Sequence, residues 1–220
     1  MGFIAIGDIH GCSRTLDHLL RTLQPAAEDH LVFVGDYVDR GPDSKGVVER
    51  CLALAGLHQC TFLRGNHEVY VLDFLAGQVD PLWDLNGGAA TRRSYSDSAG
   101  QIAVPDVHRR FFLETELYLE TPNWVFVHAG LRPDRTVRDN LVECGSDVFL
   151  EERSHLCVND AALKWEKTVV CGHTPTPQPI NREKLIGIDT GCIWAAHRGF
   201  GRLTAVRLPE REFVSVINRD

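Results

Sequence analysis

Short apolar runs alternate with amphipathic helical patterns in the first third of the chain. Three runs of β-forming residues, at 3–6, 31–34 and 61–63, are bounded by glycine or charged residues and predict buried strands. Between these runs, apolar residues recur at helical spacing after Ser13 and again after Ser44, and each serine is a candidate helix cap. Strands that alternate with helices in this way predict a parallel βαβαβ sheet.

The pattern changes after residue 115. Two apolar runs flank the turn sequence Thr121-Pro122-Asn123 and predict a β-hairpin. Four later β-rich runs predict strands at 169–171, 185–188, 203–206 and 213–217. The segment 131–165 is polar and rich in turn residues, and the segment 76–104 is expected to be a surface elaboration. These features predict one α/β domain over residues 1–220, with parallel first strands and a mixed or antiparallel second half.

The composition narrows the class of protein. Hydrophobic residues make up 44% and charged residues 24% of the 220 positions, which excludes a disordered or fibrous chain. With 23 Lys and Arg against 30 Asp and Glu, the net charge is −7, which argues against nucleic-acid or anionic-membrane binding. No apolar run approaches the roughly 18 residues of a membrane span. We therefore expect no nucleic-acid partner and no membrane association.

The cysteines predict a reducing compartment. The 7 cysteines form no Cys-x-x-Cys motif, and a chain of this length needs no cross-links to bury a core. We expect them to be free thiols. The first residues lead directly into an apolar strand and show no signal-peptide pattern, so we expect a cytoplasmic protein.

Polar residues that bind metals follow five of the predicted strands. They are Asp8, His10, Asp36, Asn66, His128 and His173. In an open α/β sheet, ligands bind at the carboxyl ends of the strands, so we expect these side chains to converge on one site. Two carboxylates, three imidazoles and an amide oxygen suit two ions such as Mn²⁺, Fe²⁺ or Zn²⁺ and suit Ca²⁺ poorly. Asp36, on the middle of the first three strands, is the expected bridge.

Each of these short patterns is weak by itself, because an Asp-x-His or a Gly-His-Thr-Pro is usually incidental. Their joint spacing is specific: the gaps from His10 to Gly35 and from Arg40 to Gly65 are equal, and each fits one βα unit. The remaining histidines lack the context of a strand end. We interpret them as surface or core residues: His18, His30, His58, His108, His155 and His197.

The glycine-bounded motifs resemble those of calcineurin-like metallophosphoesterases. Residues 7–11, 35–41 and 65–68 are similar to the signatures Gly-Asp-x-His-Gly, Gly-Asp-x-x-Asp-Arg-Gly and Gly-Asn-His-Glu of that family. The form Gly-Asp-Tyr-Val-Asp-Arg-Gly resembles the phosphoprotein phosphatase branch, and other short motifs resemble its short prokaryotic members. The resemblance covers nearly the whole chain. It implies an α/β/β/α sandwich with a two-metal centre at the edge of the sheets.

The resemblance also implies roles for individual residues. One metal would be held by Asp8, His10 and Asp36, and the other by Asp36, Asn66, His128 and His173. The expected ions are two divalent cations, Mn²⁺ first, with Fe or Zn as alternatives. His67 matches the general acid of the family, Asp39 would orient its imidazole, and Arg40 would contact phosphate oxygens.

The resemblance also implies a second phosphate-binding arginine, at which this chain departs from the family pattern. The motif that carries it in prokaryotic relatives aligns with residues 147–153, which places Glu152 at the arginine position and Arg153 one residue later. We favour Arg153, because a carboxylate that faced phosphate would repel it.

Two substrate classes follow from the resemblance. The first is a phosphoserine or phosphothreonine of a protein, with phosphotyrosine as an additional option, hydrolysed by a metal-activated hydroxide. The alternative is a dinucleoside polyphosphate, since symmetrical diadenosine tetraphosphatases share similar motifs. His10 and the Tyr37-Val38-Asp39-Arg40 sequence favour the protein phosphatase, whereas a catalytically silent binding module is disfavoured because every expected ligand and His67 are present.

Overall fold

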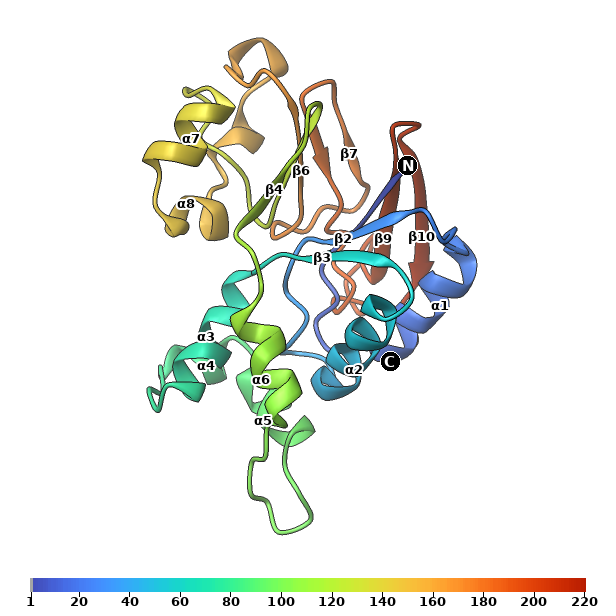
Figure 1. Ribbon diagram of the computed structural model, residues 1–220, viewed down its shortest axis with the longest axis vertical. Coiled ribbons are helices and arrows are strands. Elements are labelled where there is room, and N and C mark those ends of the chain that lie inside the picture. The colour runs from blue at the N-terminus through green and yellow to red at the C-terminus, as the bar shows by residue number, and fades with distance from the viewer. Residues whose placement is uncertain (1) are drawn as a thin grey trace.

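Two five-stranded sheets pack face to face, with helices on both outer sides (Figure 1). The computed structural model describes residues 2–220. The first sheet has the order β10-β9-β1-β2-β3. Its strands are β1 (Phe3–Ile6), β2 (His30–Phe33), β3 (Gln59–Phe62), β9 (Arg202–Leu208) and β10 (Glu212–Ile217).

The first half of the chain forms the predicted βαβαβ unit. β1 pairs in parallel with β2, and β2 with β3, through the crossover helices α1 (Ser13–Leu23) and α2 (Ser44–Ala55). The predicted helix caps were wrong by one residue. Asp43, not Ser44, caps α2 by accepting from the backbone N–H of Gly46, and Cys12 precedes α1 without a side-chain cap. β2 and β3 also end one residue earlier than predicted, and Leu63 after β3 forms only an isolated bridge with Glu116.

The second sheet is mixed, as expected, and has the order β4-β5-β6-β8-β7. Its strands are β4 (Tyr118–Glu120), β5 (Trp124–Val127), β6 (Thr168–Cys171), β7 (Ile180–Asn181) and β8 (Leu185–Gly187). β4 and β5 form the predicted hairpin, while β5, β6 and β8 are parallel to one another. The short edge strand β7 was not predicted; it pairs antiparallel with β8.

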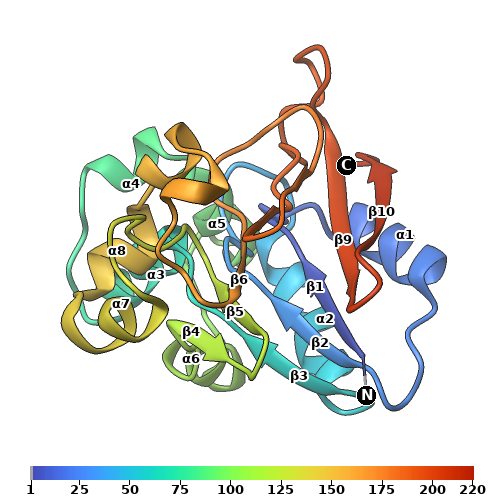
Figure 2. The ribbon, with the colours of Figure 1, turned by 90° about the horizontal axis from the view of Figure 1, so that it is seen from above.

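Helices cover the outer face of each sheet (Figure 2). The helices α3 (Asn66–Leu75), α4 (Leu82–Leu85), α5 (Gly88–Ser94) and α6 (Asp106–Leu113) follow β3. The polar segment 131–165 forms α7 (Val137–Glu143), α8 (Ser146–Glu151) and the short 3₁₀ helices η1 (Ser154–Cys157) and η2 (Asp160–Ala162) against the second sheet. In the described residues, no helix has the length and apolar character needed to cross a membrane.

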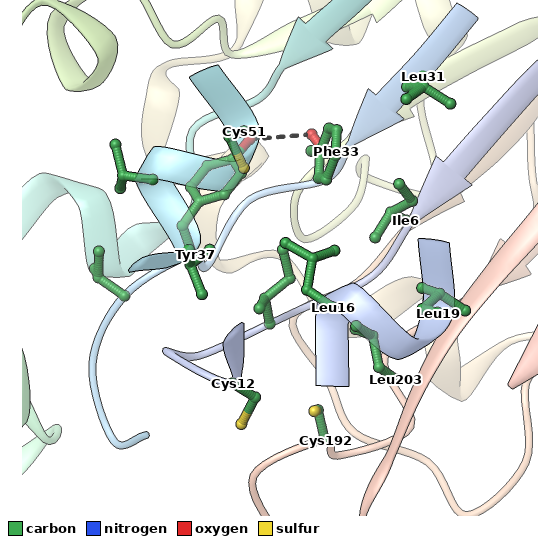
Figure 3. Packing of buried hydrophobic residues seen from close by; sticks show 14 of the residues in the cluster. Ile6, Cys12, Leu16, Leu19, Leu31, Phe33, Tyr37, Cys51, Cys192 and Leu203 are labelled. Carbon is green, nitrogen blue, oxygen red and sulfur yellow. Dashed lines mark hydrogen bonds between the residues drawn. The ribbon is translucent and has the colours of Figure 1, made fainter. Parts of the chain in front are cut away.

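Three clusters of buried residues hold these layers together. One lies between the sheets and includes Val32 of the first sheet and Phe126 of the second. Another packs α1 and α2 on the first sheet, where the Tyr37 hydroxyl donates to the carbonyl of Phe33 at 3.4 Å (Figure 3). All seven cysteines are free thiols, as predicted.

The prediction of a surface elaboration at 76–104 was wrong. Trp83 of α4 and Tyr95, at the end of α5, are buried in the same cluster as α1 and α2. The sequence pattern missed this because α4 and α5 are too short to show a helical periodicity. The segment is part of the core, and it lies directly beside the site described below.

Candidate functional site

The carboxyl ends of the parallel strands of both sheets meet at one edge of the molecule. The imidazole Nδ1 of His128, after β5, donates to the carbonyl of Val34, after β2, at 2.9 Å. The backbone N–H of His173, after β6, donates to Asp8 Oδ2, after β1, at 2.9 Å. These contacts between the sheets bring together all six residues predicted from the strand ends.

Backbone strain is concentrated at the same edge. In the described residues, seven non-glycine residues have a positive φ. Five of them are predicted site residues: His10, Asp36, Asp39, Arg40 and His173. Such a conformation costs about 1–3 kcal/mol for a residue with a Cβ and persists only where the surrounding contacts impose it. The loops are therefore shaped to aim these side chains inward.

Two glycines allow the close approach of site carboxylates. A Cβ on Gly65 would lie 2.1 Å from Asp36 Oδ1, and a Cβ on Gly172 would lie 2.0 Å from Asp8 Oδ1. Both separations are far shorter than any van der Waals contact. The glycines of these motifs are thus required by the packing of Asp8 and Asp36 against backbone.

One group of ligand atoms gathers around His128. Because its Nδ1 donates to Val34, its Nε2 carries a lone pair, and this atom faces three other oxygen or nitrogen atoms of polar side chains. They are Asn66 Oδ1 at 3.1 Å, His173 Nδ1 at 3.1 Å and Asp36 Oδ1 at 3.4 Å. Such separations are typical of neighbouring ligands that each lie about 2.0–2.2 Å from a shared cation. The chemistry of this donor set fits a divalent metal.

A second group lies on the other side of Asp36. His10 Nδ1 donates to the carbonyl of Val38 at 2.9 Å, so His10 Nε2 holds the lone pair and lies 3.4 Å from Asp36 Oδ2. Ligand atoms of His67 complete a set within 4.8 Å of one another, in which Asp36 again takes part. Asp8 is outside that set, but its Oδ1 is buried with no hydrogen-bond partner. A cation beside Asp8 would satisfy this oxygen.

The electrostatics of the site also fit cations. Burial, reinforced by Asp189 and Asp36, raises the pKa of Asp8 well above its usual range. Burial would raise the pKa of Asp36 as well, but the surrounding histidines outweigh it and hold that pKa low. Burial lowers the pKa of His10 and His128 and brings that of His173 to about 3, so these imidazoles stay neutral and keep their lone pairs.

His67 is held by a hydrogen-bond chain. Its Nδ1 lies 2.7 Å from Asp39 Oδ2, and both side chains are buried. Asp39 in turn accepts from Trp83 Nε1 at 3.0 Å and from Thr91 Oγ1 at 2.5 Å. Burial opposes protonation of His67, but Asp36 and the bond to Asp39 outweigh it and raise the pKa of the imidazole.

Trp83 and Thr91 were missed because segment 76–104 was expected to lie on the surface. The signal that pointed to them was Asn86-Gly87-Gly88. Gly87, at φ 99°, accepts from the backbone N–H of Arg40 at 3.2 Å, and a Cβ on Gly88 would lie 2.4 Å from the Trp83 ring. This glycine pair therefore docks the segment onto the site loops.

Glu68 was also missed as a site residue, although it belongs to a recognised motif. Its carboxylate accepts from the backbone N–H groups of Gly65, Asp36 and Tyr37 at 2.8–2.9 Å. It thereby joins the loop after β3 to the loop after β2. Its role is to fix the position of the backbone that carries Asp36.

A polar cavity of about 280 Å³ lies above the two ligand groups. Arg40 and Arg153 both line this polar cavity. Arg40 Nη1 is 2.6 Å from His10 Nε2, and Arg153 Nη2 is 2.7 Å from His173 Nε2. Glu152 turns away and accepts from the backbone N–H of Ser154, whereas Glu151 Oε2 lies 3.6 Å from His173 Nε2.

Known proteins share this architecture and these motifs. The chain is 29% identical to the asymmetrical bis(5'-nucleosyl)-tetraphosphatase PrpE of Oceanobacillus iheyensis, over 97% of this chain and 91% of that protein. It is 32% identical to serine/threonine-protein phosphatase 1 of Salmonella typhimurium, over 92% and 90% of the two chains. The crystal structure of a putative diadenosine tetraphosphatase superposes with a TM-score of 0.74 at 27% identity, covering 100% of this chain and 94% of that one. Residues 1–199 match the model of the calcineurin-like phosphoesterases, and the chain belongs to that family.

Proposed function

We propose that this metallophosphoesterase hydrolyses dinucleoside polyphosphates of the diadenosine tetraphosphate type. The observation that carries the proposal is the pairing of two metal-competent ligand groups, which share Asp36, with two guanidinium groups on the polar cavity above them. Polyphosphate offers several anionic groups to such a set of cations. The choice of dinucleotide over phosphoprotein is supported by the similarity to bis(5'-nucleosyl)-tetraphosphatases, both asymmetrical and symmetrical.

In this proposal, the two ligand groups hold two divalent metal ions, and we favour Mn²⁺ as their identity. One would be bound by Asp8, His10 and Asp36, and the other by Asp36, Asn66, His128 and His173. When bound, the ions acidify a water molecule and offset the charge of the phosphate oxygens. The neutral imidazoles and the partnerless Asp8 oxygen support this assignment.

The two arginines bind phosphate once the histidines are engaged with metal. In the structure, Arg40 donates to the His10 nitrogen atom that a cation would need, and Arg153 contacts His173. If His10 served as a metal ligand, Arg40 would lose that acceptor, and its planar donors would be free for phosphate oxygens. Arg153 is the proposed second phosphate contact, whereas Glu152 faces its own backbone.

His67 is the proposed general acid. Asp39 holds the proton on Nδ1, so a protonated His67 presents its other proton, on Nε2, toward the departing oxygen. The proton matters most for a poor leaving group such as an alkoxide. A nucleotide phosphate leaves more readily and depends on it less.

A phosphoprotein is the second candidate substrate. The observation that favours it is the 32% identity to a serine/threonine-protein phosphatase, together with the Tyr37-Val38-Asp39-Arg40 sequence. Both substrates would use the same ligands and the same acid, and they differ in the number of phosphate groups that they offer to Arg40 and Arg153.

A substrate panel with defined metal tests the proposal. Purified protein is incubated with Mn²⁺ and either diadenosine tetraphosphate or a phosphoserine peptide, and the products are separated by chromatography. We expect a higher kcat/KM for the dinucleotide. Products of AMP with ATP identify asymmetrical cleavage, and two ADP identify symmetrical cleavage. A clear preference for the phosphopeptide would reverse the order of the two candidates.

A further inference from the structure

An aromatic hollow of about 290 Å³ opens beside the polar cavity. We define the aromatic hollow by its lining residues Pro175, Trp194, His197 and Phe200. Its volume is just below the range of about 300–1,000 Å³ for sites that bind drug-sized molecules. None of its lining residues is needed for the chemistry proposed above.

The aromatic hollow is joined to the site by Arg40. The guanidinium carbon of Arg40 lies over the Trp194 ring, 5.5 Å from its centroid, while Nη1 of the same guanidinium contacts His10. Pro175 also continues from a loop of the site, because it follows His173 by two residues. One guanidinium thus separates the rings from the ligands of the proposed metals.

The loop that carries the rings is shaped by its own backbone. It closes on itself through the bond from the Gly201 N–H to the Gly191 carbonyl, at 2.9 Å, and through three further turns inside it. Gly191 has φ 65°, and a Cβ there would lie 2.7 Å from the Phe200 ring. Trp194 and His197 pack edge to face at 5.5 Å. The rings are therefore positioned before any ligand binds, which limits the entropic cost of binding.

Trp194 is 38% exposed although it is among the largest apolar side chains of the protein. Exposed aromatic side chains beside a cationic group are typical of sites at which nucleic-acid bases stack. Arg40 thus has the polar cavity, which suits a phosphate group, on one side and flat aromatic rings, which suit a base, on the other. A nucleotide contains both of these groups.

We propose that the aromatic hollow binds one nucleobase of the substrate, stacked on Trp194, while Arg40 contacts the adjacent phosphate. This inference rests on the proposed function and adds a specificity-determining subsite to it. A nucleobase is favoured over a peptide side chain because the hollow is small, has a planar ring as its main wall, and adjoins a cation that matches the 5'-phosphate. A peptide side chain is an outcome that the test distinguishes.

The first test measures binding without turnover. AMP and ribose 5-phosphate, which differ only in the base, are titrated against the Mn²⁺-loaded protein by calorimetry. We expect AMP to bind at least about tenfold more tightly, in line with the stacking of one base on an aromatic ring. In Trp194→Leu this advantage should be lost, while Trp194→Phe, which keeps a flat ring, should retain most of it. Equal affinity for the two probes in the wild-type protein would overturn the inference.

Trp124, the first residue of β5, provides a matched control, because the site lies at the opposite, carboxyl end of this strand. Arg211 lies over the ring of Trp124 at 5.5 Å, the same kind of contact as that between Arg40 and Trp194. Trp124→Leu should leave the preference for AMP unchanged. Circular dichroism verifies that each variant is folded, and His197→Ala provides a second removal of aromatic surface if Trp194→Leu does not fold.

The second test uses kinetics. For Trp194→Leu we expect KM for diadenosine tetraphosphate to rise at least about tenfold, with kcat/KM for β-glycerophosphate within about twofold of wild type. Equal losses on both substrates would overturn the inference, because they would indicate a displaced Arg40. A loss confined to phosphopeptides would assign the hollow to a peptide side chain. If the wild-type protein does not cleave the dinucleotide, the proposed function fails, while AMP binding still decides whether a base site exists.

Discussion

The indole Nε1 of Trp83 lies 3.0 Å from both carboxylate oxygens of Asp39. Asp39 is fully buried and also accepts from His67 at 2.7 Å, so a residue of α4 controls the direction of the proposed general acid. Trp83 is itself only 1% exposed. A side chain outside the recognised motifs is thus linked to the imidazole by a single carboxylate.

Replacement of Trp83 by Phe should therefore impair acid catalysis. We expect kcat for β-glycerophosphate to fall about tenfold, because acid catalysis contributes about 10²–10⁴-fold and the imidazole loses part of its alignment. The rate with p-nitrophenyl phosphate should change little. The matched control is Trp165→Phe, since Trp165 is equally buried and its indole donates to the carbonyl of Arg132 rather than to Asp39. Equal effects of the two variants would contradict a positioning role for Trp83.

His67→Asn should separate the acid from the metal ligands. We expect kcat to fall by about 10²–10⁴-fold for β-glycerophosphate and much less for p-nitrophenyl phosphate, whose leaving group needs no proton. Metal content, measured by mass spectrometry of the purified protein, should remain at the wild-type value. Equal losses on good and poor leaving groups would count against His67 as the acid.

Asp36→Asn should remove metal and turnover together. Both candidate ligand groups include Asp36, so loss of its charge weakens both sites at once. We expect less than half of the wild-type metal content and a kcat below detection. Asp17→Asn, in a partly exposed ion pair with Arg50, serves as the control and should keep full metal content. A variant at Asp36 with two ions bound would refute the bridging role.

Stability should depend on pH through His155. Burial lowers the pKa of this histidine to about 4, while its pKa in an unfolded chain is about 6.5. Between these values the unfolded chain takes up a proton that the folded chain excludes, so stability decreases as the pH falls through this window. The full effect is on the order of 3 kcal/mol. Urea unfolding of wild type and His155→Leu across the window should show the wild type losing more stability, and parallel curves would disprove it.

The first turn of α1 should depend on Asp220. Cys12 provides no side-chain cap, but the Asp220 carboxylate accepts from the backbone N–H groups of Arg14 and Thr15 at 3.1 and 2.9 Å. Asp220→Ala should lower the free energy of unfolding by about 1 kcal/mol, the usual value of such a cap. Glu210→Ala, in the exposed turn before β10, should have no effect in the same denaturation experiment. An unchanged midpoint for Asp220→Ala would contradict the capping role.

The site was predictable to the extent that local sequence determines it. Asp8, His10 and Asp36 follow strands whose parallel pairing is dictated by the βαβαβ order. Their closeness to one another therefore follows from the order of elements along the chain. His128 and His173 follow strands of the second sheet, and their convergence with the first group was expected from their position at strand ends and from the resemblance to a family. In physical terms, their approach depends on the packing of Phe126 and Val170 against the first sheet, which leaves no periodic signal in the sequence.

By itself, the amino-acid order determined the strands of the first sheet, the glycine-bounded turns after them and the set of metal-competent side chains at their ends. These features depend on contacts between near neighbours in the chain and on the period of apolar residues. Only the tertiary structure decided that Trp83 holds Asp39, that Arg153 rather than Glu152 faces the polar cavity, and that Trp194 stands beside Arg40. Each of these relationships joins residues from separate segments, and long-range packing, which has no local period, sets the distance between them.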